Sequence, residues 1–197
     1  MLAFPRIPVL PIISGMNPQS RRKFKDLCAL CYNSLREWQN VSRKAWPVLE
    51  RFANERVALL EDNHKQNVLA EMSAEDESSF ELLRSSVDKF AALIQQLLTI
   101  SNYLNGLIEL LTSRSEASSS DMAVTKVSKV AEVVSDVLST LKLDFECKRS
   151  IVSEIGAADN KDLVITYLAM WLHEPCIPDS SFSYPFLLLS SIASVEN

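Results

Sequence analysis

The feature that most constrains the fold is an apolar pattern between residues 80 and 111. Its positions alternate steps of three and four without a break, and only one of them is polar: Phe80, Leu83, Val87, Phe90, Ile94, Leu97, Ser101, Leu104, Ile108 and Leu111. Because an α-helix has 3.6 residues per turn, this spacing places them on one helical face. Neighbouring leucines widen that face, so we expect a bundle of several helices and not a lone two-stranded coil.

Glycine is scarce, with only Gly15, Gly106 and Gly156 in 197 residues. Phosphate-binding loops and tight β-turns both need glycine, because a positive φ has little steric cost only there. Neither common nucleotide-binding motif can be written with glycines so far apart. We therefore expect an all-α fold, an antiparallel bundle of long coiled-coil-like helices with a short C-terminal helix. Gly106 is expected to allow close helix contact, and Gly156 to end a helix at its C′ position.

The same spacing predicts helices on both sides of this segment. The first is expected to start at residues 18–20 and to end or kink at Pro47, with a second stretch continuing to about Ala70. A further helix covers 123–156, and Lys148 is the polar exception on its apolar face.

The last predicted helix reads KDLVITYLAMWLHE and stops before Pro175. Asp159 or Asn160 is expected to cap its start, with Asp162 in the first turn.

These elements predict one bundle domain over residues 18–176. An extended proline-rich tail, 1–17, precedes it, and a C-terminal extension, 177–197, follows it. A serine-rich linker is expected at about 113–121. The extension contains the run FLLLSSI, for which a short helix and a docking strand both stay open.

Charge is unevenly distributed along a chain whose net charge is −5. Residues 1–70 have a net charge of +5, and residues 71–197 have −10. The basic run RRKFK at 21–25 fits a nuclear-import signal or the solvated start of a helix. The absence of a long apolar run and of a signal peptide predicts a soluble intracellular protein with reduced thiols and no membrane span.

No chemical site emerges from the side-chain patterns. Cys28 and Cys31 form the only C-x-x-C pair, but they lie inside an amphipathic helix and no second ligand pair accompanies them. No hydrolase or zinc-protease motif is present. We expect no catalytic residues, no metal, no cofactor, no small-molecule substrate and no direct nucleic-acid binding.

The most unusual run lies at the end of the last predicted helix. Tyr167, Met170 and Trp171 share one face with Leu163, while Leu168 and Leu172 cover another. Tryptophan, methionine and tyrosine are favoured at protein interfaces, so the run fits a partner-binding surface as well as it fits a bundle core. His173 is expected to favour the helix C-terminus.

This run carries a resemblance to a known family, the cyclin-dependent kinase 2-interacting proteins. The matching letters lie mainly in 148–175, and a few lie in the first helix: Lys148, Arg149, Asp162, Leu163, Tyr167, Leu168, Met170, Trp171, Leu172, His173 and Pro175, with Arg22, Lys23, Lys25, Asp26 and Trp38. The chain departs from the family at its proline-rich start, at Cys176 and in the PFLLLSSI tail.

The resemblance implies a small adaptor without catalysis, with the nucleus as its main location and the cytoplasm as a second one. It implies protein partners: subunits of a AAA+ ATPase assembly acting in large-ribosomal-subunit maturation and on replication complexes, a second small helical subunit, cyclin-dependent kinase and replication proteins. It links the chain to the cell cycle and to the DNA-damage checkpoint. The predicted partner-binding residues are Lys148, Arg149, Tyr167, Met170, Trp171, Leu172, His173 and Pro175.

Two alternatives fit parts of the same pattern. A helical tether of the vesicle-trafficking kind would also have long heptad faces, and it predicts a cytoplasmic, membrane-peripheral location. A dithiol redox or metal protein would use Cys28 and Cys31.

Overall fold

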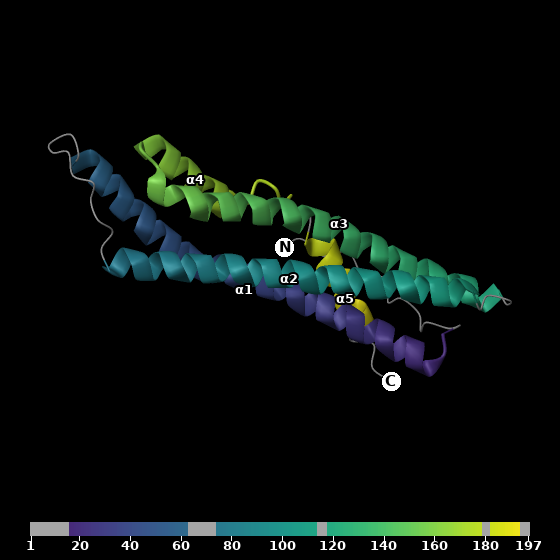
Figure 1. Ribbon diagram of the computed structural model, residues 1–197. Helices are drawn as coiled ribbons and strands as arrows, with labels where there is room; N and C mark the ends of the chain where they lie inside the picture. The colour runs from purple at the N-terminus through teal and green to yellow at the C-terminus, as the bar shows by residue number, and fades with distance from the viewer. Residues whose placement is uncertain (1–15, 63–73, 114–117, 179–181, 194–197) are drawn as a thin grey trace, which may run out of the picture. The chain divides into compact units, whose positions relative to one another are not determined.

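The computed structural model describes residues 16–62, 74–113, 118–178 and 182–193. Five α-helices and one 3₁₀ turn make up nearly all of these residues (Figure 1): α1 (Pro18–Asp62), α2 (Ala74–Ser113), α3 (Ser118–Glu154), η1 (Ile155–Ala157), α4 (Lys161–His173) and α5 (Ser183–Ala193). The described ranges contain no strand, and the predicted all-α fold is confirmed. In those ranges no helix is long and apolar enough to cross a membrane.

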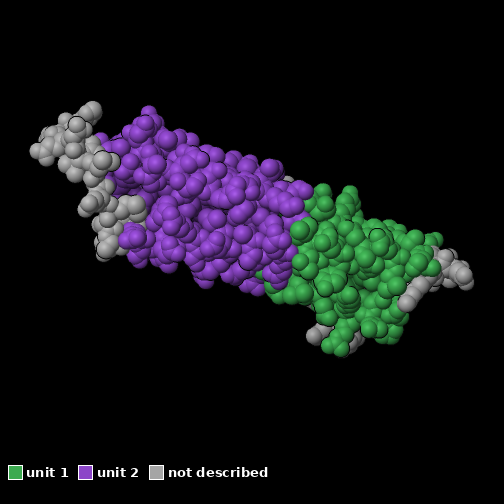
Figure 2. All heavy atoms as spheres, viewed as in Figure 1, with its two compact units in different colours: residues 1–35, 97–137, 180–197 green, residues 36–96, 138–179 purple. Residues whose placement is uncertain are grey.

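The chain divides into two compact units, coloured separately in Figure 2. Unit 1 comprises residues 1–35, 97–137 and 180–197, and unit 2 comprises residues 36–96 and 138–179. The three long helices each contribute one part to each unit, while α4 belongs to unit 2 and α5 to unit 1.

Side-chain contacts define helix directions in unit 2. Trp38 of α1 packs on Phe90 of α2 with ring centroids 4.5 Å apart, and Phe52 packs on Phe80 at 5.8 Å. Residue numbers rise along α1 while they fall along α2, so the two helices are antiparallel. Likewise α4 runs antiparallel to α3. Tyr167, in the middle of α4, donates to Glu154 at the end of α3, whereas Trp171, closer to the end of α4, meets Lys148 earlier in α3.

In unit 1 the apolar faces of α1, α2 and α3 form the interior, joined by α5. Tyr32 of α1 contacts Phe186 of α5 edge to face, with ring centroids 5.4 Å apart. The FLLLSSI run is therefore helical, with four buried residues: Pro185, Leu188, Leu189 and Ile192. The predicted periodic positions on α2 and α3 are buried or half-buried throughout both units, as expected.

The start of α1 is set by local chemistry that the sequence contains. Asn17 accepts a hydrogen bond from the Ser20 backbone N–H at 2.7 Å, which is an N-cap. Pro18 takes the first helical position, where its missing N–H has no partner to lose. The predicted start is confirmed.

At Pro47 the expectation of a helix end is wrong. The helix α1 continues through Pro47 to Asp62. Proline removes one backbone hydrogen bond there, but Pro47 is exposed, so water can solvate the carbonyl left without its donor. Packing of Leu49, Phe52 and Ala53 on the far side of Pro47 continues the apolar face.

Some segment boundaries differ from the prediction. The expected linker at 113–121 is shorter, since α2 ends at Ser113 and α3 begins at Ser118. The acidic residues 75–77 lie in the first turn of α2. Most of the proline-rich tail, the end of the second stretch near Ala70 and residues 194–197 lie outside the described residues.

Neither glycine of the described bundle does what its position suggested. Gly106 has no atom within 4 Å of an added Cβ, so it makes no close helix contact. Gly156 lies in the 3₁₀ turn η1, and its φ is not in the left-handed region, so it is not a left-handed C′ residue. Asn160 is the cap of α4, accepting from the Leu163 N–H at 2.8 Å.

Candidate functional site

The structure separates the eight predicted partner-binding residues into two groups. Lys148, Tyr167 and Trp171 are buried in unit 2. The others are exposed: Arg149, Met170, Leu172, His173 and Pro175. The buried three belong to the core, so a direct surface contact is available only to the exposed five, for which partner binding stays a prediction.

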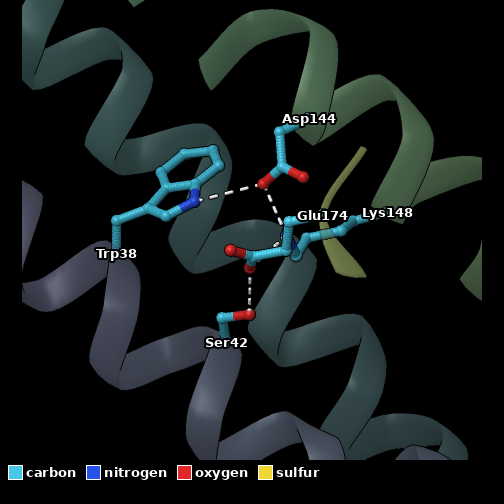
Figure 3. Close-up of polar contacts among 5 residues, drawn as sticks. All are labelled: Trp38, Ser42, Asp144, Lys148 and Glu174. Atoms are coloured by element: carbon cyan, nitrogen blue, oxygen red, sulfur yellow. Dashed lines mark hydrogen bonds and ion pairs between the residues drawn. The ribbon is translucent and has the colours of Figure 1, made fainter. Parts of the chain in front are cut away.

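A cluster of charged and aromatic side chains surrounds Lys148, which is only 1% exposed (Figure 3). Its Nζ donates to Asp144 Oδ2 at 2.5 Å and to Glu174 Oε1 at 2.8 Å. Trp38 Nε1 donates to the same Asp144 oxygen at 3.2 Å, and Ser42 Oγ donates to the same Glu174 oxygen at 2.7 Å. We call these five residues the ion cluster.

Two aromatic rings complete the surroundings of the ammonium group. Lys148 Nζ lies 5.6 Å from the centroid of Phe90 and 5.4 Å from that of Trp171. A ring face attracts a cation through its quadrupole, and this attraction grows when water is excluded. The ion cluster thus connects α1, α2, α3 and the end of α4 inside one unit.

Glu174 reaches Lys148 from an unusual backbone conformation. It follows α4 with a φ of +42°, the one positive value among the described non-glycine residues. Its N–H donates to the Met170 carbonyl at 3.1 Å, and its carbonyl accepts from the Ile177 N–H at 2.7 Å. A left-handed glutamate costs about 1–3 kcal/mol, so the bonds to Lys148 and Ser42 must offset that strain.

Electrostatics in the cluster are dominated by loss of water. Burial raises the pKa of the Asp144 carboxyl above its ordinary value, because desolvation outweighs the lowering effect of the Lys148 ammonium. A buried ion pair of this kind contributes little net stability, but removing one partner leaves a buried charge unpaired. Loss of either partner is therefore expected to destabilise the packing of the helices that the cluster joins.

Trp171 lies at the centre of the C-terminal block and is 2% exposed. Its ring packs on Phe90, with centroids 6.3 Å apart. Its Nε1 is buried and has no hydrogen-bond acceptor among the described residues. Burying an N–H without an acceptor costs free energy. The contacts of the Trp171 ring with Phe90 and with the Lys148 ammonium must therefore offset that cost.

Exposed apolar side chains flank the buried face of α4 on both sides. Val164, Tyr167 and Trp171 form the buried face of this helix. The exposed apolar residues are Ile165, Met170 and Leu172, and Leu172 is 56% exposed. Ile165 and Leu172 lie on one flank and Met170 on the other, and we call these three residues the exposed apolar residues of α4.

Cysteine chemistry at the C-x-x-C pair is disfavoured by burial. Cys28 and Cys31 are buried free thiols in α1. Burial raises the pKa of Cys31 to about 12 and moves that of Cys28 further upward, with a smaller contribution from Cys31. Reactive thiols need the opposite shift. Within the described ranges no cluster of three metal-ligating side chains exists.

Sequence reasoning identified Lys148 and Trp38 but missed their partners Asp144, Glu174 and Ser42. One signal was available: Asp144 lies four residues before Lys148, the spacing of a helical ion pair. Glu174 and Ser42 are distant in sequence, and no periodicity relates them to Lys148.

Comparison with known proteins bears out the resemblance on which these residues were chosen. No family model matches the chain. It is 28% identical over 196 residues to a mouse protein, covering 91% of this chain and 89% of the relative. A human protein is 24% identical over 193 residues, and a bovine one is 24% identical over 207, with coverage of 88–95%. All three are named cyclin-dependent kinase 2-interacting protein, and this chain is similar to them along almost its whole length.

Proposed function

We propose that this chain is a non-catalytic helical adaptor that binds other proteins through the exposed apolar residues of α4. The observation that carries the proposal is that large apolar side chains stay exposed on α4 beside the face that is buried in the core. The relatives are named for an interaction with cyclin-dependent kinase 2, which supports a cell-cycle-related interacting protein.

Our finer proposal concerns the partners. By its resemblance, the chain docks on a AAA+ ATPase assembly acting in large-ribosomal-subunit maturation and replication-complex turnover. A second small helical subunit accompanies it there, and a cyclin-dependent kinase and replication proteins bind it in checkpoint signalling. The exposed apolar residues Ile165, Met170 and Leu172 are available for such helix or groove contacts, which depend on a few buried anchors.

Leu172→Asp tests this proposal, with Leu82→Asp as a matched control. Leu172 is 56% exposed on α4 and Leu82 is 55% exposed on α2, both in unit 2. Each tagged variant is purified from cells and probed for cyclin-dependent kinase 2 and AAA+ ATPase subunits. We expect at least tenfold less of these partners with Leu172→Asp and an unchanged amount with Leu82→Asp. If circular dichroism shows that both variants are folded and both recover equal amounts of these partners, the proposed binding surface is wrong.

For location we propose the nucleus, with the basic run at 21–25 as the import signal. Arg22 and Lys23 in that run are exposed, which an import receptor requires. A fluorescent fusion should be nuclear, and Arg22→Ala with Lys23→Ala should shift it to the cytoplasm. A wild-type fusion found on cytoplasmic membranes would favour the tethering function instead.

A further inference from the structure

Two half-buried thiols of unit 2, Cys147 and Cys176, lie outside the buried C-x-x-C pair. Cys147 lies on α3, and Cys176 lies in the turn that follows α4. Both are free, and both are half-buried, whereas Cys28 and Cys31 are buried. An oxidant in solution can therefore reach the first pair more easily than the second.

The turn that carries Cys176 is fastened to α3 beside Cys147. The Ile177 N–H donates to the Glu174 carbonyl at 2.7 Å, which closes a turn over Pro175 and Cys176. The side chain of Glu174 accepts from Lys148 Nζ at 2.8 Å, and Lys148 directly follows Cys147 in the chain. The ion cluster thus holds both cysteine-bearing segments in one place.

Cys176 is close enough to Cys147 to affect the charge of the Cys147 thiol. Burial raises the pKa of the Cys147 thiol, and an ionised Cys176 raises it further. The effect of Cys176 exceeds that of Asp144, which lies one turn away on the same helix. Since such effects fall with distance, Cys176 is a spatial neighbour of Cys147.

We propose that Cys147 and Cys176 are a redox pair, which a hydroperoxide converts to a disulfide that clamps the end of α4 to α3. The raised pKa makes Cys147 the slower nucleophile, so Cys176 meets the oxidant first and Cys147 resolves the product.

The chemistry balances with hydrogen peroxide as the oxidant. The Cys176 thiolate attacks one peroxide oxygen, the O–O bond breaks, and a sulfenic acid and hydroxide form. Cys147 sulfur then attacks the sulfenic sulfur, the S–O bond breaks, and water leaves after taking the thiol proton. Over both steps the two thiols lose two electrons, and peroxide is reduced to two waters.

The disulfide would close a loop of about 30 residues, which restricts the unfolded chain. We expect the melting temperature of the oxidised chain to rise by about 10 °C over the reduced chain. Reduction with dithiothreitol should reverse the rise.

The experiment exposes the full chain to hydrogen peroxide, then unfolds it and labels free thiols with N-ethylmaleimide. Intact mass should show two labels on oxidised protein in place of four on reduced protein, with a peptide cross-link between Cys147 and Cys176. Cys147→Ser and Cys176→Ser should each abolish the cross-link, while each folds and melts close to the reduced wild type.

Three results would overturn the proposal. The first is four labelled thiols after peroxide treatment, and the second is a cross-link that joins Cys28 to Cys31 or joins two chains. A Cys147–Cys176 cross-link that leaves the melting temperature unchanged would exclude the clamp.

Discussion

The interiors of the two units differ in the polar residues that they bury. Among the described residues of unit 1, the buried polar ones are two serines, Ser20 and Ser34, and the other buried residues are apolar. In unit 2 the buried residues include Asp144 and Lys148. An apolar interior tolerates changes that keep its volume, whereas a buried ion pair tolerates no loss of either partner. Unit 2 therefore has one demanding contact, and three of the residues that carry the family resemblance take part in it: Trp38, Lys148 and Trp171.

The largest effect is expected from Lys148→Met. This change keeps the volume but leaves the buried Asp144 carboxylate without its cation, and we expect a loss of about 3–5 kcal/mol at neutral pH. Urea unfolding followed by circular dichroism measures it. Leu104→Ala in the apolar interior of unit 1 is the comparison.

The losses of stability caused by Lys148→Met and by Leu104→Ala should differ in their dependence on pH. The pKa of Asp144 is raised in the folded protein, so between its ordinary and raised values the folded state holds a proton that the unfolded state has lost. Stability therefore falls as pH rises through that window. Without Lys148 the pKa of Asp144 in the folded protein should rise further, so this pH window extends to higher pH. At acid pH Asp144 is protonated with or without Lys148, and the stability lost through Lys148→Met should therefore be smaller there. A loss of equal size at every pH would contradict this account of the cluster.

For Leu104→Ala we expect a loss of about 2–5 kcal/mol with no pH dependence of its own. Leu104 is fully buried in unit 1, and its removal leaves a cavity and no charge. The same urea titrations test it. If this loss varied with pH as steeply as that of Lys148→Met, the contrast between the two interiors would be wrong.

A smaller effect is expected from Ser42→Ala, about 1 kcal/mol, because it removes one hydrogen bond to Glu174 and leaves the bond from Lys148. Ser86→Ala is the matched control, since the Ser86 hydroxyl bonds only the Leu82 carbonyl of its own helix. Thermal unfolding of both variants compares them. Equal stability of the two would show that Ser42 does not support the left-handed Glu174.

The smallest expected change is a gain in stability and not a loss. Gly106→Ala should stabilise the chain by up to about 1 kcal/mol, because alanine favours the helix and nothing lies within 4 Å of the added Cβ. Gly156→Ala is the comparison in unit 2, where the added Cβ would meet Phe52 at 3.9 Å and Phe80 at 4.0 Å. A destabilised Gly106→Ala would mean that the position is covered by a partner.

Most of the helical framework could be predicted, because its signals are local. The Asn17 cap, the Asn160 cap and the apolar face of residues 80–111 each depend on residues within a few turns. Pro47 misled the prediction, since the cost of a proline depends on whether water can reach the freed carbonyl. That is a property of the folded surface and not of the local sequence.

The ion cluster could be predicted only in part. Lys148 was recognisable as the polar exception on an apolar face, and Asp144 had helical pairing distance. That Lys148 points inward toward Glu174, and not outward to a partner, depends on the path of α4 back along α3. For the same reason, the sequence fitted both a core position and an interface position for Trp171. Helical periodicity identifies which residues share a face, but it does not say what packs against that face.

By itself the sequence determined the helical class and the apolar faces, because scarce glycine and 3.6-residue periodicity act through local backbone preferences. Only the tertiary structure decided which charges are buried, which side of α4 stays exposed and which cysteines become neighbours. Those properties depend on contacts between residues more than one hundred positions apart, such as Trp38 with Asp144 and Ser42 with Glu174. Such contacts form only when whole helices pack, so no local pattern encodes them.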